Sequence, residues 1–344
     1  MSDPNALDSD ALAPYLEDHV PGFSGLEAIE KFKSGQSNPT YLLKARSGRY
    51  VLRAKPPGIL LKSAHQVDRE FRVMAVLSGA GFPVPKVLHL AGEESPIGRM
   101  FYVMDFVDGR IFWDPALPEI SASSERAAIY DSMNATLAAL HGIDIEAAGL
   151  GDFGKPGNYF ERQLGRWTSQ YRASETVAVP DMDRLIAWLE SEIPRDNGLT
   201  SLVHGDYRLD NMIFASDKPS VLAVLDWELS TLGHPYADLA YQCMQWRLPH
   251  ASGFRGLGGI SRASVGLPSE EDYVADYCRR RNIDGIPNWR FYLAFSFFRL
   301  AAICQGVYKR SVDGNASNPE KAKLYGDAVT LLAGLAARLI NEKD

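Results

Sequence analysis

The chain has 344 residues, of which 46% are apolar and 23% charged, and its formal net charge is −7. This length exceeds what one hydrophobic core usually serves, so we expect two domains or two lobes around a cleft. The acidic balance argues against a general nucleic-acid-binding protein, which would carry a basic face.

The first part of the chain is predicted to form a small sheet with one helix across it. Residues 8–20 have the spacing of a short helix, ended by Pro21-Gly22. The segment Ser63–Ser78 also has apolar residues at helical intervals. Strands are expected at Ile29–Phe32, Tyr41–Ala45, Arg49–Ala54, Val87–Leu90 and Met100–Val107. The order is therefore β-β-β-α-β-β.

After this sheet the pattern changes to long amphipathic helices. These are predicted at Glu125–His141, Asn158–Ala173, Asp181–Ile193, Asp238–Trp246, Glu270–Arg281, Asn288–Lys309 and Asn318–Asn341. Short strands are expected at Ser201–Val203, Met212–Phe214 and Val221–Leu225. The sequence thus predicts an α+β protein with a hinge at residues 104–109, a first lobe over 1–107 and a second over 108–344.

Two neighbouring segments carry residues typical of phosphoryl transfer. LVHGDYRLDNMIF contains Asp206 and, five residues later, Asn211; VLAVLDWE ends a following strand with Asp226. Phosphoryl transfer needs a carboxylate near the attacking hydroxyl and oxygen ligands for Mg²⁺. Kinase folds place these groups in this order, with the second metal ligand after a hairpin. The pattern predicts Asp206 as the catalytic residue, and Asn211 and Asp226 as metal ligands.

These segments resemble the aminoglycoside phosphotransferase and choline kinase-like family, whose marker HGDxxxxN is followed by a strand and a DxE-like step. The resemblance extends to Asp238-Leu239-Ala240, and YVLRAKPPG, SAHQVDREFRV and FSFFRLAAICQGVYKR are similar to the phosphotransferase module fused to some acyl-CoA dehydrogenases. It implies a protein kinase-like two-lobed fold, with a nucleotide-binding first lobe and a second lobe carrying catalytic loop, metal site and substrate-binding helices. It also implies ATP and Mg²⁺ as cofactors.

The first lobe supplies candidate nucleotide contacts. Arg53 stands where protein kinases have a Lys, and a guanidinium can hold phosphate oxygens bidentately. Lys55, on the same face by strand alternation, is the competing cation. Glu70 is the expected partner of that cation, with an ordinary surface Glu as the alternative. The resemblance implies main-chain contacts to adenine from Asp105 and Val107.

A small-residue loop joins two strands of this lobe. Small residues let backbone N–H groups approach an anion, so the loop is predicted to cover the phosphates, with a plain hairpin turn as the alternative. Its candidate residues are Ser34, Gly35, Gln36 and Ser37.

Other conspicuous residues are expected to be structural. We expect His204 to position the loop, and Asp238 to be an N-cap or loop anchor rather than a ligand. Arg299, in an apolar helix, is expected to be a satisfied core Arg rather than a ligand. The glycine-rich segment Gly253–Gly266 is predicted to be a mobile loop that covers the substrate.

The three scattered cysteines indicate a reducing compartment, and we expect them to be buried. The acidic N-terminal segment lacks the features of a secretory signal. The most apolar stretch, Phe291 to Val307, contains Arg299 and Gln305 and predicts a buried helix. We therefore expect a cytoplasmic protein without membrane, nucleic-acid or obligate protein partners.

The predicted function is transfer of the ATP γ-phosphate to a hydroxyl of a small molecule. The acyl-CoA dehydrogenase-associated subgroup implies a hydroxyacyl-CoA or hydroxy acid rather than an aminoglycoside. Such a substrate calls for basic residues, for which the candidates are Arg208, Arg247, Arg255, Arg262 and Arg299. Two alternatives stay open. One is a metal-dependent hydrolase with ligands His204, Asp206, Asp226 and His234; the other is a non-catalytic nucleotide-binding module.

Overall fold

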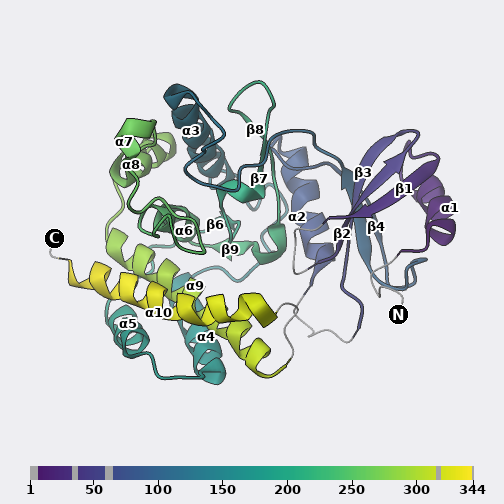
Figure 1. Ribbon diagram of the computed structural model, residues 1–344. Helices are drawn as coiled ribbons and strands as arrows, with labels where there is room; N and C mark the ends of the chain where they lie inside the picture. The colour runs from purple at the N-terminus through teal and green to yellow at the C-terminus, as the bar shows by residue number, and fades with distance from the viewer. Residues whose placement is uncertain (1–6, 33–37, 59–64, 315–318, 343–344) are drawn as a thin grey trace. The chain divides into compact units, whose positions relative to one another are not determined.

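The computed structural model describes residues 7–32, 38–58, 65–314 and 319–342 (Figure 1). They form two compact units, each described by itself below. The first comprises Met1–Ile111, Glu146–Leu150 and Asn211–Ser230. The second comprises Phe112–Ile145, Gly151–Asp210 and Thr231–Asp344. The lobe boundary between residues 107 and 108 stays a prediction.

The first unit is built on a five-stranded antiparallel sheet in the order β1-β2-β3-β5-β4. Its strands are β1 (Leu26–Lys31), β2 (Thr40–Ala45), β3 (Gly48–Ala54), β4 (Val87–Ala91) and β5 (Phe101–Asp105), and its helices are α1 (Ser9–His19) and α2 (Val67–Gly79). The predicted β-β-β-α-β-β order is confirmed. α2 begins at Val67, later than the expected Ser63, and β5 ends at Asp105 rather than at Val107.

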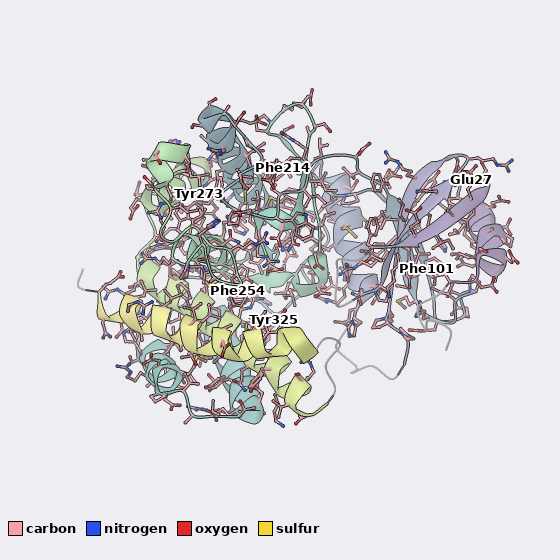
Figure 2. All side chains as sticks on the ribbon, in the orientation of Figure 1. Glu27, Phe101, Phe214, Phe254, Tyr273 and Tyr325 are labelled. Carbon is pink, nitrogen blue, oxygen red and sulfur yellow. The ribbon has the colours of Figure 1, made fainter. Side chains whose placement is uncertain are left out.

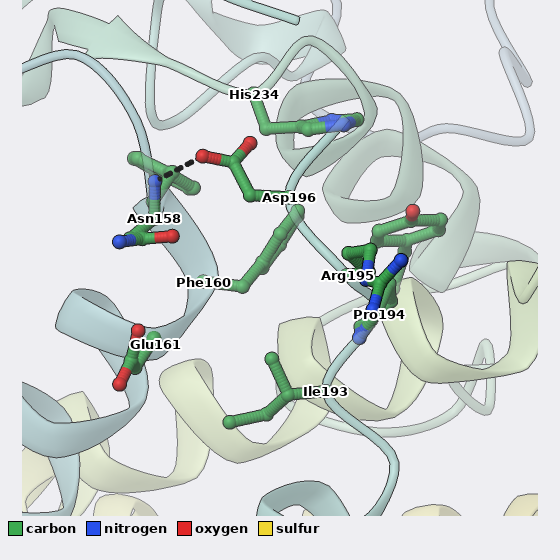
Figure 3. Close-up of a pocket in the computed structure, with 10 residues that line it drawn as sticks. Asn158, Phe160, Glu161, Ile193, Pro194, Arg195, Asp196 and His234 are labelled. Carbon is green, nitrogen blue, oxygen red and sulfur yellow. Dashed lines mark hydrogen bonds between the residues drawn. The ribbon is translucent and has the colours of Figure 1, made fainter. Parts of the chain in front are cut away.

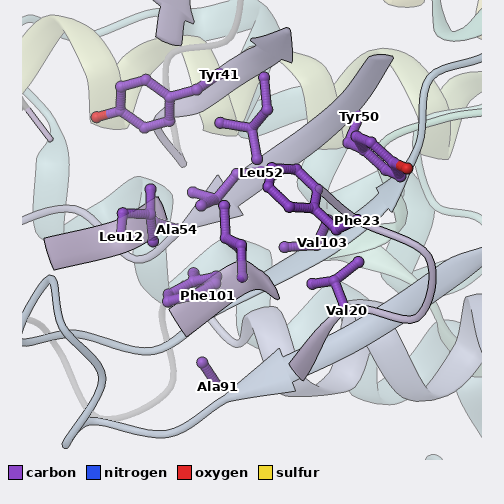
Figure 4. Close-up of a cluster of buried hydrophobic side chains, with 12 residues drawn as sticks. Leu12, Val20, Phe23, Tyr41, Tyr50, Leu52, Ala54, Ala91, Phe101 and Val103 are labelled. Carbon is purple, nitrogen blue, oxygen red and sulfur yellow. The ribbon is translucent and has the colours of Figure 1, made fainter. Parts of the chain in front are cut away.

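Strand alternation gives the two faces of this sheet different contents. Leu52 of β3 and Phe101 and Val103 of β5 join Leu12 of α1 in a buried apolar cluster (Figure 4; Phe101 is also labelled in Figure 2). Because successive side chains of a strand point to opposite faces, Arg53 faces the other way. Arg53 is paired in the β3–β5 register with Tyr102. The polar face therefore lies opposite the apolar core.

A hairpin from later in the sequence belongs to the same unit. Its strands are β7 (Met212–Phe214) and β8 (Val221–Val224), followed by a 3₁₀ turn at Trp227–Leu229. The hairpin is tied to the first part of the chain by backbone hydrogen bonds between Arg110 and Phe214, donated in both directions. Gly109 is required here, since a Cβ would lie 2.3 Å from the Phe214 carbonyl oxygen.

The second unit is mainly helical. It contains α3 (Ser123–Leu140), α4 (Tyr159–Ser174), α5 (Pro180–Ser191), α6 (Tyr236–Cys243), α7 (Arg262–Val265), α8 (Glu270–Arg281), α9 (Trp289–Val312) and α10 (Pro319–Asn341), with the two-stranded sheet β6 (Ser201–Val203) and β9 (Thr231–Gly233). All seven predicted helices are present. β9 and α7 were not predicted.

α9 lies at the centre of the second unit, where it packs against α4, α5, α6 and α10. By length and composition it could cross a membrane, but 72% of its most apolar window is buried inside the protein. The predicted buried helix is confirmed. The three cysteines are also free and buried, as expected.

The first unit's core allows a matched test of burial. Leu52 is 0% exposed, whereas Leu222 on β8 of the same unit is 38% exposed. We expect Leu52→Ala to lower the free energy of unfolding by about 2–5 kcal/mol, because it leaves a cavity. Leu222→Ala should cost less than about 1 kcal/mol. Urea denaturation followed by circular dichroism measures both, and equal losses would contradict the core assignment.

Candidate active site

One guanidinium organises the polar face of the first unit's sheet. Arg53 Nε lies 2.9 Å from Glu70 Oε2, which is the predicted ion pair. Its Nη2 donates to Asp226 Oδ1 at 2.7 Å and to Glu228 Oε2 at 3.4 Å. The Arg53 side chain is only 11% exposed. Three carboxylates therefore surround one nearly buried cation.

Glu70, on α2, is the buried centre of this cluster. Its carboxylate accepts hydrogen bonds from the Tyr102 hydroxyl at 3.0 Å and from Asn38 Nδ2 at 2.9 Å. Burial raises the pKa of Glu70 to about 7, although Arg53 and Tyr102 oppose that rise. The pKa of Arg53 is raised: burial acts to lower it, but the surrounding carboxylates outweigh burial. The guanidinium is thus a permanent cation.

The β7–β8 hairpin places Asn211 and Asp226 at one end of the first unit's second sheet. Asn211 directly precedes β7, and its carbonyl oxygen accepts the Leu225 N–H at 2.8 Å. Asp226 directly follows Leu225, and its backbone angles are φ 66° and ψ 63°. A non-glycine residue in this left-handed region is strained by about 1–3 kcal/mol, and such strain concentrates at functional sites. The fold therefore holds Asp226 in an unfavourable conformation beside Asn211.

These two residues fit a magnesium ion. Mg²⁺ prefers oxygen ligands and is usually held by one or two protein side chains together with substrate phosphates. An Asn amide oxygen and an Asp carboxylate at one hairpin end meet that requirement. No group of three or more His, Cys, Asp or Glu side chains arranged for a metal occurs among the described residues.

In the second unit, Asp206 lies on the loop that follows β6. The buried carboxylate of Asp238 holds this loop, because it accepts the backbone N–H groups of His204 at 2.6 Å and Gly205 at 2.8 Å. Asp238 also contacts His141 Nε2 at 3.4 Å. The predicted loop anchor is confirmed. The alternative N-cap role is wrong, since Pro235 is the N-cap of α6 and Asp238 lies inside the helix.

The surroundings of Asp206 favour its negatively charged carboxylate, the form that can accept a proton. Burial acts to raise its pKa, but Arg208, His204, a hydrogen bond from Tyr241 and Arg299 outweigh burial and hold the pKa below its ordinary value. Arg208 Nε lies 3.4 Å from Asp206 Oδ1. His204 is fully buried, and its Nδ1 accepts the Asp206 N–H at 3.1 Å. His204 therefore has the expected loop-positioning contact.

Comparisons with known proteins identify the family. The model of the Phosphotransferase enzyme family matches residues 28–292. The chain belongs to the phosphotransferase enzyme family. It is 48% identical to a putative aminoglycoside phosphotransferase of Ralstonia eutropha, with a TM-score of 0.87 and coverage of 97% of this chain and 98% of that one. The predicted two-lobed, kinase-like α+β fold is confirmed by this structure.

Curated relatives of this phosphotransferase are longer proteins. The chain is 50% identical over 333 residues to acyl-CoA dehydrogenase family member 10 of Mus musculus, covering 96% of this chain and 31% of that protein. It is 43% identical over 338 residues to family member 11 of Homo sapiens, covering 97% of this chain and 43% of that protein. The chain thus spans less than half of these relatives.

The remaining predicted nucleotide contacts lie in or next to the first unit's sheet. The Asp105 N–H donates to the Lys86 carbonyl at 2.9 Å, so only its other backbone groups could meet adenine. Lys55 pairs with Glu93 at 2.7 Å instead of joining the Arg53 cluster. Val107 lies just beyond β5, and Ser34, Gly35, Gln36 and Ser37 lie outside the described residues. The adenine and phosphate contacts stay predictions.

Sequence reasoning missed several residues that contact the candidate site residues. Glu228 lies two residues after Asp226 within the LDWE motif, so the motif itself could have suggested it. Asn38 and Tyr102 carry no such signal. Asn38 is buried, and its side chain contacts both Glu70 and, at 3.0 Å, His65 Nδ1. Tyr241, which hydrogen-bonds Asp206, was also missed because no sequence motif marks it.

The glycine-rich segment Gly253–Gly266 is more tightly held than expected. Leu257 is fully buried, and its N–H donates to the Gln245 carbonyl at 2.8 Å. Gly256 approaches Leu248 so closely that a Cβ would lie 2.1 Å from the Leu248 carbonyl oxygen. The middle of the segment is therefore anchored, and a substrate-covering role stays a prediction.

A pocket of about 220 Å³ in the second unit is lined by none of the residues predicted for phosphoryl transfer (Figure 3). Asp196 on its wall accepts the Asn158 N–H at 2.8 Å. His234, a ligand in the hydrolase alternative, stacks on Tyr292 with ring centroids 5.6 Å apart, and its Nδ1 accepts the Tyr236 N–H at 3.3 Å. His234 therefore acts as a packed wall residue.

His234 should make the free energy of unfolding decrease as the pH falls. Burial lowers its pKa from 6.5 to about 4, so the folded protein holds the imidazole neutral. The stability it contributes is complete above its ordinary pKa and is lost as the pH falls toward 4. At about pH 5 this loss amounts to about 2 kcal/mol.

We expect His234→Gln to reduce the acid-induced loss by that amount. Urea denaturation at about pH 7.5 and about pH 5 measures the difference for both proteins. Equal losses in the variant and the wild type would contradict this reading of His234.

Proposed function

We propose that this chain is an ATP- and Mg²⁺-dependent phosphotransferase that moves the γ-phosphate to a hydroxyl of a small molecule. The observation that carries the proposal is the cluster of Arg53 with Glu70 and Asp226, next to Asn211 on the same unit. Distant relatives with this fold support the nucleotide. One is an aminoglycoside phosphotransferase in complex with ADP and hygromycin B, and another is a spectinomycin phosphotransferase in complex with ADP and spectinomycin.

In the proposed reaction, the substrate oxygen attacks the γ-phosphorus and the bond from that phosphorus to the bridging oxygen breaks. ADP leaves with the bond electrons, and Asp206 accepts the hydroxyl proton. Asn211 and Asp226 would hold Mg²⁺, which when bound would supply positive charge to the phosphates. Most of the rate enhancement then comes from positioning and charge stabilisation, as in other phosphoryl transfers.

The charges around Arg53 suit this role. One guanidinium and the three carboxylates of Glu70, Asp226 and Glu228 leave an excess of negative charge. A divalent cation would offset that excess. Arg53 is held by its ion pair with buried Glu70, and its Nη2, which contacts Asp226, could then donate to phosphate oxygens if Asp226 were to bind a metal.

For the acceptor, we propose a hydroxyacyl-CoA or hydroxy acid rather than an aminoglycoside. Support comes from the relatives named acyl-CoA dehydrogenase family members 10 and 11, which are far more similar in sequence than the aminoglycoside enzymes with known ligands. We also propose a cytoplasmic location, in keeping with three free, buried cysteines.

The catalytic role is tested by ADP formation with Mg²⁺-ATP. The acceptor panel contains hydroxyacyl-CoAs, free hydroxy acids, aminoglycosides and choline-like alcohols. Because a general base contributes about 100-fold to 10,000-fold, Asp206→Asn should lower stimulated turnover by at least about 100-fold while ATP still binds. Asp217→Asn, at an exposed position of the β7–β8 turn, is the control and should keep full activity. Failure of the wild type to bind ATP would overturn the proposal.

The metal role is tested by Asp226→Asn. Removing one ligand charge should raise the Mg²⁺ concentration for half-maximal turnover by at least about tenfold, or abolish turnover. A Mg²⁺ titration of ADP formation, with Asp217→Asn again as control, measures this. Unchanged metal dependence in Asp226→Asn would remove Asp226 from the metal site.

A further inference from the structure

Arg299 is a nearly buried cation with no acid in ion-pair contact among the described residues. It lies in the middle of α9, and its exposure is 8%. Among the residues that the structure describes, none forms an ion pair with its guanidinium or accepts a hydrogen bond from it. Arg53 and the more exposed Arg247 each contact two or more carboxylates. Arg99, which is as buried as Arg299, has no ion pair among the described residues but donates to the Tyr41 hydroxyl at 3.4 Å. The expected role of Arg299 as a satisfied core Arg rather than a ligand therefore stays a prediction.

Two aromatic rings take the place of acids. The guanidinium carbon of Arg299 lies 5.7 Å from the ring centroid of Trp167 on α4 and 5.3 Å from that of Tyr241 on α6. Ring faces attract a cation, but they accept none of the five N–H hydrogen bonds that a guanidinium offers. The arrangement orients the planar group and leaves its N–H donors for a further partner.

Tyr241 links this cation to the loop of the proposed base. The Tyr241 hydroxyl hydrogen-bonds the Asp206 carboxylate, while the Tyr241 ring faces Arg299. Arg299 is also near enough for its charge to help lower the pKa of Asp206. The unpartnered cation and the proposed base thus lie in one neighbourhood of the second unit.

We infer that Arg299, held between Trp167 and Tyr241, binds an anionic group of the acceptor, so that the acceptor is an alcohol carrying an oxyanion. The inference rests on the proposed function and adds the residue that recognises the anionic group of the acceptor. Burying a cation without an acid is costly, and a ligand oxyanion would offset that cost. The planar fork of a guanidinium matches a carboxylate or a phosphate with paired hydrogen bonds. A cationic aminosugar would be repelled.

The test compares acceptors that differ in whether and where they carry a negative charge; each acid and its amide differ almost in charge alone. The probes are hydroxy acids of four to eight carbons, the primary amide of each, and the CoA thioester of each, which replaces the carboxylate by distant phosphates. The readout is kcat/KM for ADP formation. Wild-type protein should favour anionic members over amides by about tenfold to 100-fold, the value of one charge-assisted contact. Preference for free acids would assign a carboxylate, and preference for thioesters a phosphate.

In Arg299→Gln, kcat/KM for the anionic acceptors should fall by about tenfold to 100-fold, mainly through KM, and that for the amides should stay within about threefold. Arg299→Lys should recover part of the preference. Arg310→Gln, at an exposed position on the same helix, is the matched control and should behave as wild type. A charge preference that survives in Arg299→Gln, or is absent from the wild type, would overturn the inference.

The thermal stability of variants distinguishes a ligand-binding role of Arg299 from a purely structural one. If Arg299 serves only packing, Arg299→Met should lower the thermal midpoint. If it serves ligand binding, the midpoint should stay or rise because an uncompensated charge is removed. A second variant, Trp167→Leu, leaves the cation but removes one ring face and should also weaken the charge preference. A lowered midpoint in Arg299→Met with unchanged preference in Trp167→Leu would overturn the binding role.

Failure of the inference and failure of the proposed function give different results. ATP binding and loss of turnover in Asp206→Asn test the function without reference to Arg299. If no acceptor is turned over, calorimetric titration with the hydroxy acids still tests the anion site. Binding to wild type that is lost in Arg299→Gln supports the inference, and absence of binding by every acid and thioester overturns it.

Discussion

The ion pair between Arg53 and Glu70 is the interaction on which the first unit's polar face depends. Both groups are nearly buried, and removing one partner of such a pair typically costs about 3–5 kcal/mol because the other charge is left uncompensated. Glu70 also receives hydrogen bonds from Asn38 and Tyr102. The pair therefore ties α2, β3 and β5 to one another. Asp226 and Glu228 add the hairpin segment to the same cation.

In the second unit, the buried carboxylate of Asp238 is stabilised differently from that of Glu70. Asp238 has no Arg or Lys partner in ion-pair contact among the described residues, and its carboxylate accepts backbone N–H groups of His204 and Gly205 instead. Burial acts to raise the pKa of Asp238, but a hydrogen bond from His141, the charges of His141 and His204, and the Gly205 N–H outweigh burial and hold the pKa below its ordinary value. The two backbone hydrogen bonds anchor the loop that carries Asp206, and catalysis by positioning requires such an anchored loop.

Arg299 departs from both patterns. No described residue forms an ion pair with its guanidinium or accepts a hydrogen bond from it, and two aromatic faces are its contacts. Arg99, which is equally buried, also has no ion pair among the described residues, but it donates to the Tyr41 hydroxyl. The exception has a physical reason if the missing acceptor belongs to a ligand. Because the contacts of Arg299 differ from those of the other buried charges, we assign binding of the acceptor's anionic group to this residue of α9.

The sequence alone determined the element order, the family and the phosphotransferase motif residues, because helical and strand periods and the spacing of Asp206, Asn211 and Asp226 are local properties. It could not place Asn38 or Tyr102 beside Glu70, nor reveal β9. Those depend on packing between segments far apart in the chain: Asn38 and Glu228, for example, are separated by 190 positions. The absence of an acid beside Arg299 was likewise decided only by tertiary structure, since a single sequence shows which residues are charged but not which charges meet.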